Sequence, residues 1–364
     1  LDSPLPRKLA PVKDILRLGA AQLLFLDTPA HAVVDTAVEI TKKGKFGPYA
    51  GMVNAVLRRL SREGKDLAAA VDAPRLNTPR WLWQDWVATY GEDVTRAMAE
   101  AHLTEAPLDI TLRPGEDSAA WAERLEAVVL PTGTLRRAAG GSIGALPGFD
   151  EGAWWVQDAA AAIPARLLGD VAGLRVADLC AAPGGKTMQL AAAGAEVLAV
   201  DRSARRLRRV SENLARLHLT AQVIDADAVK WRPEELVDAV LLDAPCSATG
   251  TIRRHPDVPR HKTPNDVETL AATQAALLRS AAEMVKPGGL VVYCVCSLQA
   301  AEGPAQIAAA LDLGLPFEIV PVTPDEVGGL SELITPDGAL RTLPSHLPGQ
   351  GGLDGFYAAR LRRV

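Results

Sequence analysis

Three stretches within the first 72 residues space their apolar side chains at helical intervals. The apolar stripes are Ile15, Leu16, Gly19, Leu23 and Leu26, then Ala30, Val33, Val34, Ala37 and Val38, then Val53, Val56, Leu57 and Leu60. Thr28-Pro29 supplies an N-cap and a first-turn proline for the second stretch. Short connections between amphipathic helices are typical of a bundle, so residues 1–72 are predicted to form an all-α domain.

Residues 73–152 have a different character and are predicted to form a small α+β connector subdomain. Leu108–Leu112 alternates in strand fashion, and Ala119–Val129 has helical spacing. An aromatic-rich helix begins at Thr78-Pro79 and carries Trp81, Trp83, Trp86 and Tyr90. Because tryptophan is usually well buried, packing at a domain junction is favoured over base stacking for these rings.

Strand and helix patterns alternate through residues 153–364. Strands are expected at Val176–Leu179, Val197–Val200, Val223–Ile224, Ala239–Leu242 and Leu290–Tyr293, and helices at Met188–Ala193, Ala204–Leu217 and about Asp266–Met284. This alternation predicts an α/β domain with a mostly parallel, doubly wound sheet. Ligands of such sheets bind beyond the carboxyl ends of the strands. Polar residues follow these ends throughout, namely Asp201, Asp227, Asp243 and three of the cysteines.

The turn after the first of these strands suggests a nucleoside-containing ligand. It reads Cys180-Ala181-Ala182-Pro183-Gly184-Gly185-Lys186-Thr187. A cysteine stands where a P-loop requires its first glycine, and there is no GxGxxG fingerprint, so both of those motifs fail. The glycines still allow a ligand to approach the backbone. Asp201 could accept both ribose hydroxyl hydrogens and Asp227 an adenine amino hydrogen, although each acid could instead be a helix N-cap.

Composition narrows the class of protein without naming its function. Hydrophobic residues make up 48% of the 364 positions and charged residues 23%, as in globular proteins. No apolar run reaches the roughly 20 residues that span a bilayer, and no signal peptide is recognisable, so a cytoplasmic location is expected. The four cysteines, Cys180, Cys246, Cys294 and Cys296, form no CxxC pair, and no histidine has zinc-finger spacing. Neither a metal nor a disulfide is therefore expected.

The charge distribution leaves a nucleic-acid partner open. The net charge of −5 argues mildly against one, but phosphate contacts need only a local basic patch. Two basic clusters occur, Arg202, Arg205, Arg206, Arg208 and Arg209, then Arg253, Arg254, Arg260 and Lys262. The first could equally be a solvated helix face, whereas the second lies in a proline-containing loop and is the stronger candidate for RNA contacts.

Several separated strings resemble known families. The front of the chain resembles the NusB-like RNA-binding domain through Ile15-Leu16-Arg17-Leu18-Gly19-Ala20, Pro29-Ala30-His31-Ala32, Val38-Glu39 and Val53-Asn54-Ala55-Val56-Leu57-Arg58-Arg59. The remainder resembles the RNA (cytosine-5) methyltransferase family, of the RsmB (Fmu or Sun) type that modifies 16S ribosomal RNA. The strings that carry this second resemblance are Asp178–Thr187, Leu242–Gly250, Lys286–Gly289, Cys296-Ser297 and Asp354–Tyr357.

The resemblance implies a cofactor, a fold and a set of roles. The fold would be the Rossmann-like sheet of S-adenosylmethionine-dependent methyltransferases. The implied cofactor site consists of Cys180, Ala181, Ala182, Pro183, Gly184, Gly185, Lys186, Asp201, Asp227 and Asp243. Cys296 is implied as the nucleophile and Cys246 as the cysteine that assists release. The chain departs from the family pattern at Val295, where threonine is usual, and at Ala248, where glycine is common.

The chemistry of cytosine methylation explains why two thiols are needed. Carbon 5 is a poor nucleophile until a thiolate adds to carbon 6, and this covalent step divides one difficult reaction into easier ones. Lys186 could lower the pKa of the attacking thiol, and Asp243 could hydrogen-bond the cytosine ring nitrogen or amino group. The Pro-Cys cysteine attacks in DNA cytosine methyltransferases, which would favour Cys246. We hypothesise that Cys296 attacks and that Cys246 assists release.

The substrate is less tightly defined than the reaction. RNA, and 16S ribosomal RNA in particular, is the expected partner, and neither a membrane nor a metal is expected. Cytosine-5 methylation of transfer RNA is an alternative that the helical front domain disfavours, as it disfavours DNA methylation. A non-catalytic RNA-binding or antitermination factor is the remaining alternative, although it would leave the acids and the thiols unused.

Overall fold

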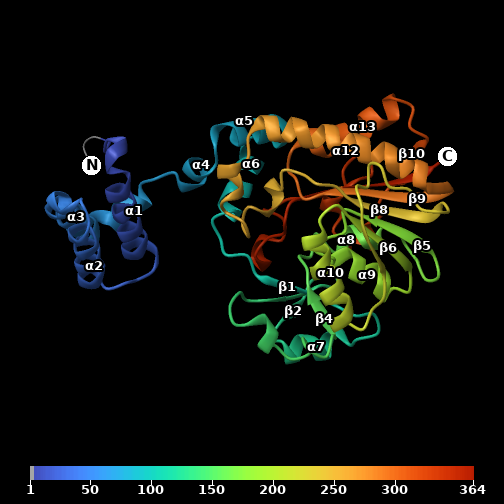
Figure 1. Cartoon of the computed structure of the whole chain (residues 1–364), viewed down its shortest axis with the longest axis horizontal. Helices are drawn as coiled ribbons and strands as arrows, with labels where there is room; N and C mark the ends of the chain where they lie inside the picture. The colour runs from blue at the N-terminus through green and yellow to red at the C-terminus, as the bar shows by residue number, and fades with distance from the viewer. Residues whose placement is uncertain (1–3) are drawn as a thin grey trace. The chain divides into compact units, whose positions relative to one another are not determined.

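The computed structural model describes residues 4–364, which divide into two compact units. The first unit extends through Leu76 and the second comprises Asn77–Val364. The second unit contains the large sheet and, from Asn77 onward, the segment expected to be a connector (Figure 1). The three-part division proposed from the sequence stays a prediction.

The first unit is a bundle of three long helices, α1 (Ala10–Phe25), α2 (Ala30–Lys43) and α3 (Ala50–Ala69). The predicted stripes meet in its core, where Leu16, Val34, Val53 and Leu57 are buried. A Cβ atom on Gly19 would come within 2.8 Å of the Leu57 side chain, so α1 and α3 approach closely there. The prediction was wrong for Leu26, which lies beyond the end of α1 and is 67% exposed.

The second unit begins with a helical segment followed by a small antiparallel sheet. Its elements are α5 (Arg80–Tyr90), α6 (Glu92–Ala101), β1 (Leu108–Leu112), α7 (Ser118–Arg124), β2 (Val128–Val129), β3 (Leu135–Arg137) and β4 (Trp154–Val156), and the short helix α4 (Ala73–Asn77) precedes them. The strand order is β2-β3-β1-β4. A single helix over residues 119–129 was a wrong prediction. The chain turns through a left-handed Glu126 (φ 51°) and Val128–Val129 then pairs with β3, so strand pairing replaces the last helical turn.

The large sheet has the strand order β10-β12-β9-β8-β5-β6-β7, and β11 pairs with β12. Its strands are β5 (Arg175–Leu179), β6 (Glu196–Asp201), β7 (Gln222–Asp225), β8 (Val237–Asp243), β9 (Val285–Val295), β10 (Phe317–Ile319), β11 (Leu340–Thr342) and β12 (Phe356–Arg363). The five strands β5 to β9 are parallel, as predicted, and antiparallel strands from the C-terminal part of the chain complete one edge.

Helices cover both faces of this sheet (Figure 1). They are α8 (Ile163–Arg166), α9 (Gly185–Ala192), α10 (Ala204–Arg216), α12 (Pro264–Met284) and α13 (Pro304–Asp312). The short helix α11 (Val258–His261) packs instead with α5 and α6, through Val258. Successive strand residues alternate between two cores: Ala177 and Leu179 pack with α12, whereas Val176 packs with α8 and α9. This alternation is the period of two expected for a strand buried on both faces. The fold is therefore the doubly wound α/β sheet that the sequence predicted.

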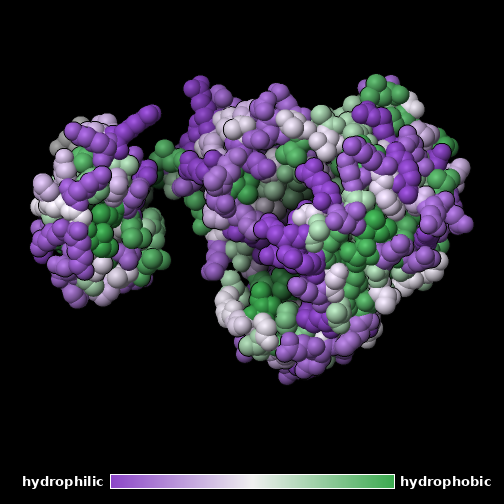
Figure 2. Space-filling view, in the orientation of Figure 1, coloured by the Kyte–Doolittle hydropathy of each residue, from purple (hydrophilic) through white to green (hydrophobic). Residues whose placement is uncertain are grey.

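The surface and the interior differ as expected for this fold. In Figure 2, hydrophilic side chains cover most of the visible face of both units, and hydrophobic side chains show in patches between them. No helix within residues 4–364 combines the length and the apolar character needed to cross a bilayer.

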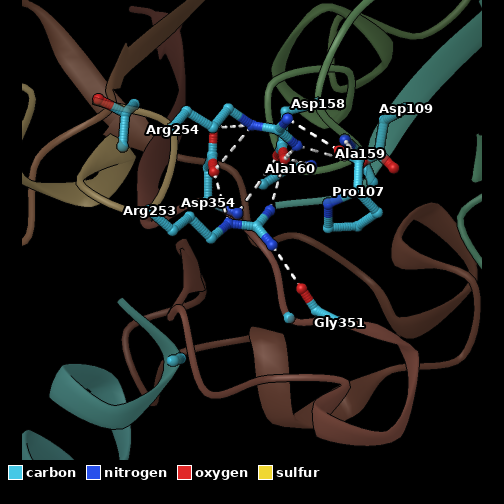
Figure 3. A network of polar contacts seen from close by, with 12 residues as sticks. Pro107, Asp109, Asp158, Ala159, Ala160, Arg253, Arg254, Gly351 and Asp354 are labelled. Carbon is cyan, nitrogen blue, oxygen red and sulfur yellow. Dashed lines mark hydrogen bonds and ion pairs between the residues drawn. The ribbon is translucent and has the colours of Figure 1, made fainter. Parts of the chain in front are cut away.

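A buried ion-pair network joins four segments of the second unit (Figure 3). Asp158 accepts hydrogen bonds from Arg253 (2.8 Å) and Arg254 (2.7 Å), and Asp354 accepts another from Arg253 (2.8 Å). Asp109, on β1, lies 3.8 Å from Arg254. Because Arg253 and Arg254 follow the loop that carries Cys246, the network fixes one end of that loop.

The network corrects part of the second basic cluster. The Arg253 side chain is 1% exposed and the Arg254 side chain 23% exposed, and both are held by carboxylates. Burial of a guanidinium group is costly unless it is paired, and these pairs satisfy it. These two arginines therefore do not offer free charge to RNA phosphates, whereas Arg260 is exposed.

Replacing Asp158 with alanine should lower the free energy of unfolding of the second unit by about 3–5 kcal/mol, because two largely buried guanidinium groups lose their shared carboxylate. Urea unfolding followed by tryptophan fluorescence measures this unit alone, since all 7 tryptophans lie in it. Glu268→Ala removes an exposed carboxylate of α12 and should change stability by less than about 0.5 kcal/mol. Equal stability of the two variants would contradict a structural role for the network.

Candidate active site

The predicted polar residues gather along one edge of the large sheet because the parallel strands end there together. In the order of the strands, β9 ends before Cys296, β8 at Asp243, β5 before Cys180, β6 at Asp201 and β7 before Asp227. In the paired register, Asp243 lies beside Cys294. The edge therefore brings together the residues that the sequence singled out one by one.

The turn after β5 adopts an unusual backbone conformation. Cys180 has φ 62° and Gly184 has φ 109°, both left-handed. A Cβ atom on Gly184 would lie 3.0 Å from Met188 and 3.4 Å from Val210, so this position favours glycine both by conformation and by space. Burial, followed by the nearby Asp243 carboxylate, raises the pKa of Cys180 to about 12. Cys180 is therefore a neutral thiol and lines the turn.

Asp178, at the base of the turn, is fully buried. Its Oδ2 accepts a hydrogen bond from Thr187 at 2.5 Å, but its Oδ1 has no hydrogen-bond partner within residues 4–364. Burial raises the pKa of Asp178 to about 7. An acceptor is thus left open beneath the turn.

The two acids that were expected to contact a nucleoside have different surroundings. Asp201 is 3% exposed, and it accepts hydrogen bonds from the backbone N–H groups of Ala182 (3.2 Å) and Ser203 (2.9 Å). Arg206 lies 3.4 Å from the same carboxylate and also donates to the carbonyl oxygen of Ala182. Asp227 is exposed, and among residues 4–364 its side chain accepts one hydrogen bond, from the N–H of Val229 (3.0 Å). Asp201 therefore shapes the turn, and Asp227 lies open to solvent.

Lys186 and Asp243 form an ion pair at the centre of the edge. The Lys186 Nζ lies 2.8 Å from Asp243 Oδ2 and 5.1 Å from the centre of the Phe356 ring. Burial opposes the charge on Lys186, but the Asp243 carboxylate outweighs it, so the pKa of Lys186 is raised above its usual value. The ammonium also interacts electrostatically with Cys294 and Cys296, which places a fixed positive charge beside them.

The two cysteines expected to react are in contact. The Sγ atoms of Cys246 and Cys296 are 3.4 Å apart, and both residues are partly exposed. The hydrogen bond to Cys296, followed by burial, raises the pKa of Cys246 well above its usual value. Cys294 is fully buried, and burial raises its pKa as well. Cys246 and Cys296 are therefore the pair available for covalent chemistry.

Backbone packing holds the loop that carries Cys246. The N–H of Gly250 donates to the carbonyl of Cys296 (3.0 Å), and the N–H of Gly355 donates to the carbonyl of Gly250 (2.8 Å). A Cβ atom on Gly250 would lie 1.9 Å from the Gly355 carbonyl oxygen, which is too close for any side chain to be accommodated at position 250. The Asp354–Tyr357 string thus lies against the thiol loops, far from them in sequence and adjacent in space.

The two departures from the family pattern have different structural meanings. Ala248 has φ 58°, a left-handed conformation that costs a residue with a side chain roughly 1–2 kcal/mol and costs glycine almost nothing. Glycine at this position would therefore relieve strain. Val295 is fully buried in the hydrophobic core beneath the edge, and its apolar side chain brings no polar group into that core.

The sequence did not single out one charged residue of the site. Glu302, in the short 3-10 helix Ala300–Glu302, is fully buried and hydrogen-bonds to residues in both thiol loops. An isolated glutamate between alanines and a glycine carries no motif, so only the fold reveals it. Among residues 4–364, no group of three or more His, Cys, Asp or Glu side chains could hold a metal ion.

Two family models match the chain in separate regions. A model described as 16S rRNA methyltransferase RsmB/F matches residues 166–362. A model of the NusB family matches residues 1–62. The first match covers the sheet and the whole thiol edge, and the second covers most of the helical bundle.

Individual relatives match over nearly the whole chain. The ribosomal RNA small subunit methyltransferase B of Vibrio cholerae is 36% identical over 379 residues, covering 100% of this chain and 84% of its own. The protein of the same name from Xylella fastidiosa is 37% identical, covering 99% and 85%. The structure of a methyltransferase homolog protein from Pyrococcus horikoshii has a TM-score of 0.66 at 26% identity, covering 80% of this chain and 97% of that one. The chain therefore belongs to the RsmB/F family of 16S rRNA methyltransferases, which are S-adenosylmethionine-dependent enzymes.

Proposed function

We propose that this enzyme methylates carbon 5 of a cytosine in 16S ribosomal RNA through a covalent adduct, with Cys296 as the attacking thiol and Cys246 assisting release. The observation that carries the proposal is the 3.4 Å contact between the two sulfur atoms, beside the Lys186–Asp243 ion pair. A simple packing role would need neither partly exposed thiols nor a buried ammonium group next to them. With ribosomal RNA as its substrate, the enzyme would act in the cytoplasm.

Three features of the edge fit S-adenosylmethionine. The left-handed Gly184 lets a ligand approach the backbone of the turn, and Asp201 ends the neighbouring strand. Asp178 Oδ1 is an acceptor to which no group of the described residues donates. The cofactor would supply an electrophilic methyl group on a sulfonium sulfur. Cys180 to Lys186 would line its site, with Asp201, Asp227 and Asp243 as the acidic residues around it.

The protein's own residues account for activation of the cytosine. The Cys296 thiolate would add to carbon 6, and the electron pair of the 5,6 double bond would then be available at carbon 5 for the methyl group. A free thiol is only a few per cent ionised at neutral pH, and the Lys186 ammonium, which interacts electrostatically with Cys296, is the cation available to this thiol. After methylation, a base removes the carbon 5 hydrogen, the double bond re-forms and Cys296 leaves as a thiolate. Cys246 is placed to assist this release.

Asp243 is placed to orient the base. Its Oδ2 is taken by Lys186, and its Oδ1 lies 3.5 Å from the Cys294 thiol. An ionised carboxylate accepts hydrogen bonds, so the exocyclic amino group of cytosine is the fitting partner. A base stacked within a helix could not reach an edge of this kind, so the target cytosine must be unpaired or flipped out.

The helical unit favours ribosomal RNA over transfer RNA and DNA. The relatives that match over nearly the whole chain, this unit included, are named as ribosomal RNA small subunit methyltransferases. Bisulfite sequencing of ribosomal and transfer RNA, from cells with and without the gene, tests the substrate directly. We expect one methylcytosine to vanish from 16S ribosomal RNA, and loss of a transfer RNA site instead would assign the transfer RNA alternative.

Removal of each thiol should give opposite covalent behaviour. Incubated with 16S ribosomal RNA and S-adenosylmethionine, Cys246→Ala should accumulate protein–RNA adducts, because release is blocked after attack. Cys296→Ala should form none, because nothing adds to carbon 6. Cys294→Ala, which changes a buried neighbouring thiol, is the matched control and should leave no persistent adduct. The three variants are compared by denaturing gel electrophoresis, and adducts from Cys296→Ala alone would reverse the two roles.

Loss of the Asp201 carboxylate should weaken cofactor binding about 10-fold or more, which corresponds to one hydrogen bond to a charged group, at roughly 1.5–3 kcal/mol. Isothermal titration of S-adenosylmethionine into Asp201→Ala measures the effect. Asp225→Ala is the matched control, because this exposed acid is paired in register with Asp201 and lies outside the predicted site. Unchanged affinity in Asp201→Ala, in protein that circular dichroism shows to be folded, would remove Asp201 from the site.

A further inference from the structure

A cluster of exposed arginines lies along the first half of α10 and the turn that leads into it. Its members, called the α10 patch below, are Arg202, Arg205, Arg208 and Arg209. The opposite side of the helix, with Leu207, Val210 and Leu214, is buried in the core against α9. The buried side fixes the helix, so the patch arginines of α10 are held on its solvent side.

The α10 patch has no carboxylate partner among residues 4–364. Arginines elsewhere on the surface of the second unit do form ion pairs, such as Arg232 with Glu283 and Arg362 with Glu318. Glu212 is the only acidic residue of α10, and it forms no ion pair within the same range. The patch is therefore a local excess of positive charge on a chain whose net charge is −5.

This arrangement of charge is unfavourable for the helix itself. Arg205 comes three residues before Arg208 and four before Arg209, a spacing at which helix side chains are neighbours and like charges repel. Arg205 also lies in the first turn, where the helix dipole favours acidic residues and disfavours cations, and α10 has no acid in that turn. Local preferences of this kind are most often violated at functional sites. The patch thus fits a negatively charged partner better than it fits the isolated helix.

The patch begins at the edge of the sheet that carries the reactive groups. Arg202 directly follows Asp201, the last residue of β6. Arg206 lies between patch residues in sequence but reaches the cofactor turn instead, 3.4 Å from Asp201 and donating to the carbonyl of Ala182. In the strand order, β6 is two strands from β8, which is about 10 Å at roughly 4.8 Å per strand. A few nucleotides bridge such a distance, at roughly 3.4 Å of helix axis each.

We propose that the α10 patch binds phosphate groups of the substrate RNA beside the target cytosine. Guanidinium groups bind phosphate oxygens through paired hydrogen bonds, and RNA is the polyanion that the reaction brings to this edge. This role rests on the proposed function and deepens it, because it assigns a surface along which the RNA lies. It also reverses the order of the two basic clusters in the sequence: Arg253 and Arg254 are held by carboxylates, whereas the α10 patch is exposed.

The test is the salt dependence of RNA binding by the full-length protein. The Kd for 16S ribosomal RNA is measured by filter binding between about 50 and 200 mM potassium chloride, without cofactor. The patch variant carries Arg205→Gln, Arg208→Gln and Arg209→Gln together. Each phosphate contact contributes about 0.7–0.9 to the slope of log affinity against log salt concentration. Loss of three contacts should therefore reduce this slope by about 2 and weaken binding about 10-fold or more at the lower salt concentration.

A second triple variant removes the same charge from another part of the surface. It carries Arg279→Gln on α12, Lys286→Gln near the start of β9 and Arg362→Gln, which is paired in register with Leu290. All three residues are exposed, and those on β9 and β12 lie away from the strand ends that carry the thiols. This control should keep both the Kd and the slope of the unmodified protein. Glutamine relieves repulsion along α10, so the patch variant should be no less stable in urea unfolding.

An unchanged slope in the patch variant would overturn the proposal. Equal losses in the two triple variants would do the same, because net charge alone would then explain the binding.

Turnover gives an independent readout of the same role. The KM for RNA should rise with the Kd in the patch variant, whereas kcat and the affinity for S-adenosylmethionine should not change. A fall in kcat at unchanged Kd would contradict a role in RNA binding. The binding measurement needs neither cofactor nor turnover, so it reports on the patch even if the adduct experiments fail. Normal adducts in a protein whose RNA binding ignores the patch would leave the proposed function intact and remove the patch alone.

Discussion

The parallel pairing of β8 with β9 is the constraint on which the site depends. In this register Asp243 lies beside Cys294, so the loops that follow these residues leave the sheet next to each other. Cys246 and Cys296 come three and two residues later, which leaves the chain little length in which to separate them. A slip of one residue would turn one set of side chains to the opposite face of the sheet. The contact between the two thiols is thus a consequence of strand pairing.

Buried charged side chains also hold together the segments around the thiol loops. Burial of an ionised group is costly, so each such group must be compensated by its surroundings. Asp158 is compensated by two arginines and Lys186 by Asp243, whereas Glu302 is surrounded by neutral donors. Each of these arrangements joins segments that are distant in sequence and that border the thiol loops. These contacts therefore anchor the site from the protein interior, whereas Cys246 and Cys296 remain partly exposed.

Much of the fold, and the meeting of the acids and thiols at one edge of the sheet, could be predicted from the sequence. Apolar periodicity reports burial directly, so the long helices and the parallel strands were found, and a strand end marks where a side chain leaves the core. Local pattern carries less information about short elements, and Val128–Val129 was assigned to a helix because only pairing with β3 makes it a strand. Charge in sequence does not reveal burial either. Arg253 resembled a surface cation, and Glu302 attracted no attention, because the partners of both are supplied by distant segments.

Identification of the residue bonded to the base tests most directly whether the thiols at this sheet edge act on a cytosine. RNA that carries 5-fluorocytosine in place of cytosine suits this purpose, because a base cannot remove fluorine as a cation and the covalent complex persists after methyl transfer. Mass spectrometry of the digested complex identifies the bonded peptide. We predict that the modified cytosine is attached to Cys296. Attachment to Cys246, or the absence of any covalent complex under conditions in which the RNA is methylated, would contradict it.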